Sequence, residues 1–242
     1  MIEMSAAARS AYVTAVRSVR PLARASGVTG YLERRSGSRP AHWARSLLAI
    51  YDLDGLIELD VPWWTYGAID VVEAFLMSRS DARVFEYGSG ASTVWLAKRA
   101  GRVTTIEHDA RWADAVHTRT RGLNVDLRLV EAPERAPRTG YASEKPGWGG
   151  RDFEPYVSAI DEAASGFDLI VIDGRARPAC LHHALSKLAA GGLIVFDNSG
   201  RARYRAAIKA SGAEATFYAG LTPSLPYPDE TALLRAAPPL PA

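Results

Sequence analysis

Five acidic residues stand at the ends of short apolar runs that have the composition of buried β-strands. They are Glu86, Glu107, Glu131, Asp173 and Asp197. In an open α/β sheet, ligands bind beyond the carboxyl ends of the parallel strands, so these side chains would meet in one site. A ring of carboxylates attracts cationic and hydroxyl-bearing ligands and repels phosphates. The acids therefore predict a ligand that carries positive charge and hydroxyl groups.

A glycine-rich turn follows the first of these acids. Residues 83–93, RVFEYGSGAST, have the order strand, turn, helix that is typical of nucleotide-binding units. Two features disfavour NAD. Glu86 would lie beside the pyrophosphate, and Thr93 stands where the G-x-G-x-x-G motif has its third glycine. Gly88 and Gly90 would let a ligand approach the backbone closely, because a side chain there would occupy the ligand's space.

A ligand with a nucleoside, an amino group and a sulfonium suits these residues better. Glu107 follows Glu86 by 21 residues, near the spacing of about 20 at which the acid of the second strand reaches ribose hydroxyls. Its two carboxylate oxygens can accept hydrogen bonds from two vicinal hydroxyls. S-adenosylmethionine carries all of these groups, and the sequence favours it over NAD.

Short β-rich runs alternate with helical stretches from residue 83 onward. Five such units predict a parallel, doubly wound sheet. Two further runs, ATFYAGLT and ETALLRA, are joined by a proline-rich link without a helix, which indicates an antiparallel pair at the sheet edge. The predicted fold is α/β, with a mostly parallel seven-stranded sheet, an antiparallel C-terminal strand pair and an N-terminal helical extension. We expect the extension over residues 1–60, a Rossmann-like domain over 61–236 and a disordered tail over 237–242.

Five features follow one another in a characteristic order: FEYGSGAST, TTIEHD, FDLIVIDG, LAAGGLIVFDNS and the terminal strand pair. With them, residues 83–235 resemble the class I S-adenosylmethionine-dependent methyltransferases. The resemblance implies an enzyme that binds S-adenosylmethionine and methylates a small-molecule acceptor, with a hydroxyl oxygen expected and a nitrogen left open. The residues that it implies at the cofactor are Glu86, Gly88, Ser89, Gly90, Ser92, Thr93, Glu107, His108, Glu131 and Asp173.

The methyl acceptor has to lose a proton, to a general base or with the help of a metal. Asp173 and Asp197 are the predicted catalytic residues. With Asn198 they form a set of oxygen ligands suited to Mg²⁺, similar to that of the cation-dependent catechol and caffeoyl-coenzyme A O-methyltransferases. Arg175 and Arg177 would compete with a cation. In the alternative, the two aspartates act on the acceptor directly and the arginines bind an acidic group on it, or only pair with the acidic rim.

Aromatic residues in two irregular segments are further candidates. Residues 132–153, APERAPRTGYASEKPGWGGRDF, have neither helical nor strand periodicity, which predicts a lid over the acceptor or a disordered loop. Trp148 in this loop is a predicted substrate contact. Trp64 and Tyr66, in the turn PWWTYG, are predicted contacts of the same kind, with packing as the alternative.

Composition limits the partners. The net charge of +2 is too small to predict a nucleic-acid partner, although the first 45 residues hold eight arginines, on a solvated helical face or against an acidic partner. Helix breaks are expected there at Pro21, Gly27, Gly30 and residues 37–40. No run approaches the roughly 20 apolar residues of a membrane span. The single cysteine, Cys180, excludes an internal disulfide, so a cytoplasmic location is expected.

Three functions remain open from the sequence. A methyltransferase is favoured, an NAD-dependent oxidoreductase is the rival enzyme, and a non-catalytic S-adenosylmethionine-binding protein would have the same motifs. A homodimer through the N-terminal helices or an exposed Trp63–Trp64 surface is possible.

Overall fold

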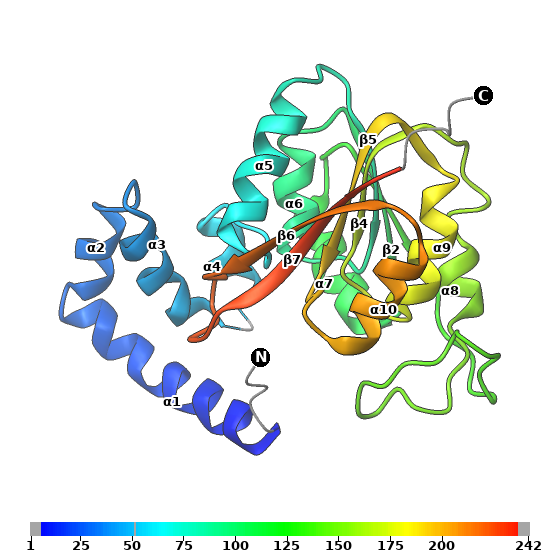
Figure 1. Cartoon of the computed structure of the whole chain (residues 1–242). Coiled ribbons are helices and arrows are strands. Elements are labelled where there is room, and N and C mark those ends of the chain that lie inside the picture. The colour runs from blue at the N-terminus through cyan, green and yellow to red at the C-terminus, as the bar shows by residue number, and fades with distance from the viewer. Residues whose placement is uncertain (1–5, 51, 237–242) are drawn as a thin grey trace.

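A seven-stranded sheet forms the centre of the chain. The computed structural model describes residues 6–50 and 52–236. The strand order is β3-β2-β1-β4-β5-β7-β6, and the chain forms these strands in seven segments: β1 (Arg83–Tyr87), β2 (Arg102–Glu107), β3 (Val125–Leu129), β4 (Phe167–Ile172), β5 (Leu188–Asp197), β6 (Glu214–Gly220) and β7 (Asp229–Arg235). β1 to β5 are parallel, and β7 runs antiparallel to both β5 and β6. The predicted fold class is confirmed, with the antiparallel pair at one edge (Figure 1).

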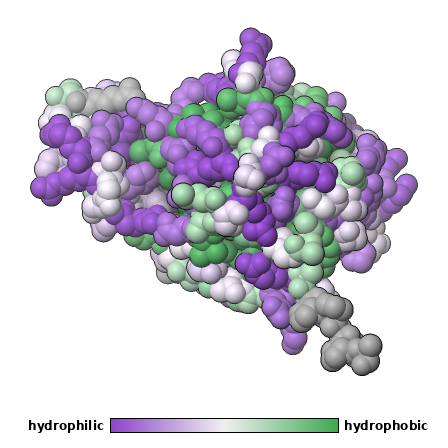
Figure 2. Space-filling model, turned by 90° about the horizontal axis from the view of Figure 1, so that it is seen from above, coloured by the Kyte–Doolittle hydropathy of each residue, from purple (hydrophilic) through white to green (hydrophobic). Residues whose placement is uncertain are grey.

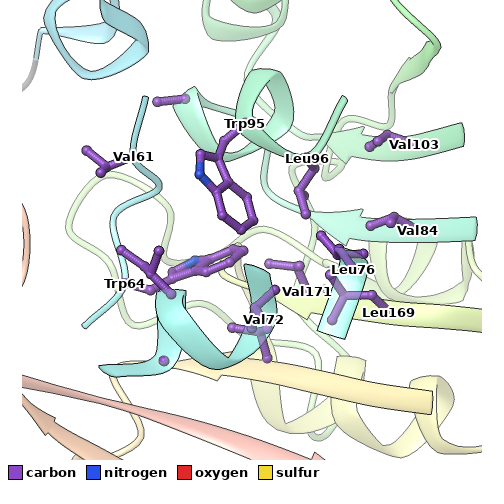
Figure 3. Close-up of a cluster of buried hydrophobic side chains, with 14 of the residues drawn as sticks. Val61, Trp64, Val72, Leu76, Val84, Trp95, Leu96, Val103, Leu169 and Val171 are labelled. Carbon is purple, nitrogen blue, oxygen red and sulfur yellow. The ribbon is translucent and has the colours of Figure 1, made fainter. Parts of the chain in front are cut away.

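Helices cover both faces of the sheet. α5 (Tyr66–Met77), α6 (Ala91–Ala97) and α7 (Ala110–Thr120) lie on one face, and α8 (Glu154–Ser158), α9 (Arg177–Leu185) and α10 (Ala202–Ala210) lie on the other (Figure 1). Side chains alternate along a strand, so Val84 enters the first core and Phe85 the second. Figure 3 shows the first core, where Trp64 and Trp95 meet at an interplanar angle of 77° beside Val171. This two-sided burial explains why β4, FDLIVI, is almost continuously apolar.

The N-terminal segment is helical. It consists of α1 (Ala6–Ala25), α2 (Val28–Glu33), α3 (Arg39–Ser46), the 3₁₀ turn η1 (Leu47–Ala49) and α4 (Leu53–Glu58). The expected breaks at Pro21 and Gly30 are wrong, because Pro21 lies inside α1 and Gly30 inside α2. Gly27, at φ 76°, does separate the first two helices. The division of the chain at residue 60 stays a prediction.

Polar contacts join these helices to the sheet edge. The Trp43 indole donates to the Leu225 carbonyl over 3.0 Å, and the Ser46 hydroxyl accepts from the Ser224 amide over 2.9 Å. Both partners lie in the link between β6 and β7. The N-terminal helices are therefore held against the antiparallel end of the sheet (Figure 1).

One strand begins earlier than the sequence indicates. The pattern of PACLHHALSKLAA, residues 178–190, predicts a helix up to Ala190, but α9 ends at Leu185 and β5 begins at Leu188. The register against β4 shifts between Phe167 and Leu169, so the first residues of β5 form an irregular start that contains Gly191 at φ 70°. The predicted disordered tail, 237–242, lies outside the described residues.

Hydrophilic residues cover most of the surface seen from above, with hydrophobic residues in smaller groups between them (Figure 2). This is the ordinary surface of a globular chain. Among the described helices, none has the length and hydropathy that a membrane crossing requires.

Candidate functional site

The glycine loop after β1 is held by the acid at the end of β2. Glu107 Oε2 accepts hydrogen bonds from the Ser89 amide and hydroxyl, over 3.1 and 3.0 Å. Oε1 accepts from the amides of His108 and Asp109, over 2.7 and 2.9 Å. Burial raises the pKa of Glu107, but His108 and these amides outweigh it, and the pKa lies below its ordinary value. A carboxylate that remains charged thus stands at the loop, as an acceptor for hydroxyl donors.

Glu86 lies behind the loop. Its side chain is completely buried, and its two oxygens accept from the hydroxyls of Ser92 and Thr93, over 2.5 and 2.6 Å. Thr93 Oγ1 also accepts from the Gly90 amide over 2.9 Å, which ties the first turn of α6 to the end of β1. Burial raises the pKa of Glu86 to about 7, against the effect of these hydroxyls. Glu86, Ser92 and Thr93 therefore shape the loop from inside, so Glu86 can act on a ligand only through the loop backbone or through the field of its charge.

The two loop glycines have different surroundings. Gly88 has φ 94°, and a methyl group on it would lie 2.8 Å from the Gly174 Cα atom. Gly90 is extended, and a methyl group there would meet nothing closer than Ser92 Oγ and Trp112 Cζ2, both at 4.0 Å. Gly88 is thus required for contact between the ends of β1 and β4, whereas Gly90 borders free space. Of the two, Gly90 is the position that a ligand can approach.

Part of the long loop 132–153 closes against the end of β2. The rings of His108 and Trp148 are 4.4 Å apart, and Phe153 and Tyr156 pack on the other sides of the imidazole. Trp148 is half-buried and keeps one side toward solvent. The exposed Glu131 lies beyond β3. His108 and Trp148 are brought together at the loop, while Glu131 remains a solvated residue at the strand end.

A buried arginine joins the ends of β4 and β5. Arg177 Nη2 donates to Asp173 Oδ1 over 2.7 Å, and Nη1 donates to the Asp197 carbonyl over 2.5 Å and lies 3.7 Å from Asp197 Oδ2. The same guanidinium donates to the Gly174 and Asp173 carbonyls. Burial and the neighbouring Asp173 raise the pKa of Asp197 well above its usual range. Asp173, with 22% of its side chain exposed, remains reachable.

This arginine stands where the predicted Mg²⁺ would sit. The third predicted ligand, Asn198, donates its amide to Asp229 over 2.8 Å. In the described part of the chain, no three His, Cys, Asp or Glu side chains are grouped so that they could hold a metal. Asp173, Asp197 and Asn198 do not fit a cation, because the positive charge that neutralises the two aspartates is a side chain of the protein. Arg177 is also predicted as a substrate contact, but its side chain is buried, and that burial does not fit contact with a substrate.

No family model matches the chain, and no curated protein matches it. Solved structures resemble its fold. A precorrin-6y C5,15-methyltransferase from Geobacter metallireducens GS-15 matches with a TM-score of 0.50 and 13% identity over 69% of this chain and 87% of that one. An rRNA methylase from Streptococcus thermophilus matches with a TM-score of 0.50 and 14% identity over 69% and 95%. The fold is that of the class I S-adenosylmethionine-dependent methyltransferases. The two proteins are named for different acceptors, a precorrin and an rRNA, so the methyltransferase fold leaves the acceptor open.

Two of the predicted substrate contacts pack in the interior of this methyltransferase fold. Trp64 is fully buried, with its indole beside that of Trp95 (Figure 3). The Tyr66 hydroxyl lies 2.8 Å from His42 Nδ1, in a contact between α5 and α3. Burial raises the pKa of Tyr66 to about 12. Both rings are buried and fill the interior, which is the packing alternative for this turn.

Two buried polar atoms near the end of β4, Tyr156 Oη and Arg175 Nε, donate to no acceptor. The Trp64 N–H lies close enough to the Asp173 carboxyl to lower its pKa, against the larger effect of burial. Unsatisfied buried polar groups are rare in folded proteins and mark places where a ligand can supply the partner.

The sequence pattern alone did not indicate Tyr156 or Trp112 as site residues. The Trp112 indole donates to the Ser89 carbonyl over 2.7 Å and flanks Gly90. Its signal is positional, because it lies in the first turn of the helix that follows the second-strand acid. Tyr156 follows a long irregular loop, and nothing in its sequence neighbourhood indicates contact with β4.

Proposed function

We propose that this chain is an S-adenosylmethionine-dependent methyltransferase that acts on a small-molecule acceptor. The observation that carries the proposal is the pair of hydrogen bonds from Ser89 to Glu107, because they join the glycine loop of the first strand to the acid of the second. This is the arrangement in which a nucleoside ribose meets a carboxylate and the rest of the ligand follows the loop. A ribose hydroxyl would take the place of the Ser89 hydroxyl on Glu107.

Two observations favour this cofactor over NAD. The dinucleotide-binding fold continues its parallel sheet beyond β5, whereas here the antiparallel β7 lies beside β5. The buried Glu86 also lies under the glycine loop, where a pyrophosphate would bind. A sulfonium and an amino group bring positive charge to the same place, and the neighbouring carboxylates stabilise that charge.

The chain's own residues have distinct roles in the proposed cofactor site. S-adenosylmethionine, when bound, supplies a methyl group on a cationic sulfur and leaves as S-adenosylhomocysteine. Gly90 provides the room for it, Glu107 accepts from its ribose, and His108 and Trp148 offer aromatic edges for its base. Glu86 holds the loop that these contacts depend on.

Asp173 is the proposed acceptor of the proton. Its carboxyl is partly exposed at the end of β4, whereas Asp197 is closed off by Arg177 and by a hydrogen bond from the Thr231 hydroxyl, 2.8 Å long. Burial raises the pKa of Asp173 against the opposing effects of Arg177 and Arg175. A pKa closer to neutral pH makes the carboxylate a stronger base. A hydroxyl oxygen is the proposed nucleophile. It would lose its proton to Asp173 as the new carbon–oxygen bond forms, and Asp197 would position the strand end.

Calorimetric titration of the purified chain with S-adenosylhomocysteine tests the cofactor. Micromolar binding is expected, unchanged by EDTA or by added Mg²⁺, together with no binding of NADH. Binding of NADH without S-adenosylhomocysteine would overturn the proposal. If the cofactor binds, an acceptor screen that pairs hydroxyl compounds with the corresponding amines tests the class of nucleophile.

A further inference from the structure

Two arginines two residues apart, at the start of α9, have opposite surroundings. Five oxygen atoms at the ends of β4 and β5 surround the Arg177 guanidinium. Four of them accept hydrogen bonds, and the fifth, Asp197 Oδ2, lies 3.7 Å away. Arg175 is half-buried, and no acidic side chain of the described residues lies within ion-pair distance of it. Its Nε atom is buried and has no hydrogen-bond partner. A guanidinium in this position has lost part of its hydration, and the carboxylate that acts on it, Asp173, is already paired with Arg177.

A second unpartnered donor lies beside Arg175. The Tyr156 hydroxyl is completely buried, donates to no acceptor, lies near the Arg175 backbone amide, and lies 1.8 Å from where a methyl group on Gly174 would stand. Gly174 precedes Arg175 in the chain, so the hydroxyl lies against the backbone that carries the guanidinium. Two buried donors that lack acceptors thus occur at one point, next to the partly exposed Asp173.

The positive charge of Arg175 is not taken up by the carboxylates around this point. Asp173 and Asp197 share Arg177, and burial with the repulsion from Asp173 drives Asp197 toward its neutral form. Arg177 also lies over the Tyr204 ring at 5.6 Å, and two further guanidiniums do so, Arg201 at 5.7 Å and Arg203, which pairs with Glu144, at 4.6 Å. An anion that enters beside Arg175 would meet this group of guanidiniums, with Asp173 already paired to Arg177 and Asp229 as the other carboxylate that acts on Asp173.

We propose that Arg175, together with the Tyr156 hydroxyl, binds an anionic group of the methyl acceptor, a carboxylate or a phosphate. This inference rests on the proposed methyltransferase function, since it takes the site beside Asp173 as the acceptor site. The planar guanidinium can hold two oxygens of such a group at once, and charge-assisted hydrogen bonds of this kind are about twice as strong as neutral ones. The acceptor class is then a small hydroxy acid or a phosphorylated hydroxyl compound.

Titration of the full chain, saturated with S-adenosylhomocysteine, tests this assignment with three probes. Benzoate and phenyl phosphate carry the two anionic groups, and benzamide is the uncharged control. At least one of the anions is expected to bind the wild-type chain, with affinity lowered roughly tenfold or more by Arg175→Gln and unchanged by Arg121→Gln, an exposed arginine at the end of α7. Benzamide is expected to bind all three proteins equally weakly.

Three results would overturn the proposal: no anion binding to the wild-type chain, equal binding to the Arg175 and Arg121 variants, or a loss of S-adenosylhomocysteine affinity in Arg175→Gln, which would assign the guanidinium to the cofactor. Thermal unfolding checks that Arg175→Gln folds. Arg175→Lys, which keeps the charge without the planar fork, is expected to have intermediate affinity. Failure of S-adenosylhomocysteine to bind the wild-type chain would count against the proposed cofactor alone, and the anion titrations without it would still test Arg175.

Discussion

Arg177 Nη2 donates a hydrogen bond to Asp173 Oδ1 over 2.7 Å, so the reachable carboxylate at the end of β4 is neutralised from inside the protein. The same guanidinium contacts the end of β5. It occupies a position in which a cation-dependent enzyme would hold its metal. In this chain the Arg177 guanidinium therefore does what a metal ion does in a cation-dependent enzyme, because it holds the ends of β4 and β5 together.

Removal of Arg177 should destabilise the fold. In Arg177→Met the carboxylates of Asp173 and Asp197 lose the charge between them, and a broken buried ion pair typically costs about 3–5 kcal/mol. Urea unfolding at neutral pH measures the loss. Arg121→Met, a change at an exposed site, is the control and should alter the free energy of unfolding by less than about 0.5 kcal/mol. Equal stability of the two variants would contradict a structural role for Arg177.

Glu86 should make the stability depend on pH. Its pKa is about 7 in the folded chain and 4.5 ordinarily, with burial as the main cause. The folded state therefore binds more protons between these values, and the free energy of unfolding should fall as the pH rises from 4.5 to about 7 and then level off. The full effect is on the order of 3 kcal/mol.

The variant Glu86→Gln removes this titration and keeps a side chain that can bond to the hydroxyls of Ser92 and Thr93. Its free energy of unfolding should match that of the wild-type chain most closely near pH 4.5 and exceed it increasingly up to about pH 7. Urea titrations at several pH values measure the difference. Glu131→Gln, at an exposed position, should follow the wild-type curve. Parallel curves for Glu86→Gln and the wild-type chain would mean that Glu86 is charged at a normal pKa.

The sequence predicts the sheet well because its information is local. β-branched runs, the acids at their ends and the link without a helix before β7 each determine one element. The sequence does not show that Arg175 and Arg177 have different surroundings, since both stand next to Ala176 in GRAR. The structure separates them because Ala176 has the left-handed conformation, φ 46° and ψ 37°, which turns the chain between them. An alanine gives no sign of that conformation, which is uncommon for residues other than glycine.

The local sequence pattern also does not predict that Trp64 is buried. A tryptophan in a turn has no periodic neighbours that would indicate its side, and its burial depends on Trp95, a residue of α6. Such tertiary contacts decide whether an aromatic ring lines a site or fills a core. The contact between the glycine loop and the second-strand acid was easier to predict, because the glycines, Ser89 and Glu107 are fixed by spacing.

Glu107 should govern cofactor affinity. In Glu107→Gln the acceptor of the proposed ribose hydrogen bonds loses its charge, and such bonds contribute about 1.5–3 kcal/mol, so S-adenosylhomocysteine should bind at least roughly tenfold more weakly. Calorimetric titration measures the change. Glu131→Gln is the comparison at the neighbouring strand end, where the side chain is exposed, and its affinity should equal that of the wild-type chain. An equal loss in both variants would place Glu131 at the cofactor as well.

The two loop glycines should respond in opposite ways to a methyl group. Gly88→Ala forces a left-handed φ of 94° on alanine and brings its Cβ atom to 2.8 Å from Gly174, so it should destabilise the fold by about 1–3 kcal/mol. Gly90→Ala has an extended backbone and 4.0 Å of clearance, so its free energy of unfolding should change by less than about 1 kcal/mol. Its methyl group would occupy the space that the cofactor is proposed to fill, and S-adenosylhomocysteine affinity should fall roughly tenfold or more. Unfolding and calorimetry on both variants separate these effects. Full affinity in Gly90→Ala would mean that the ligand does not approach the loop at this residue.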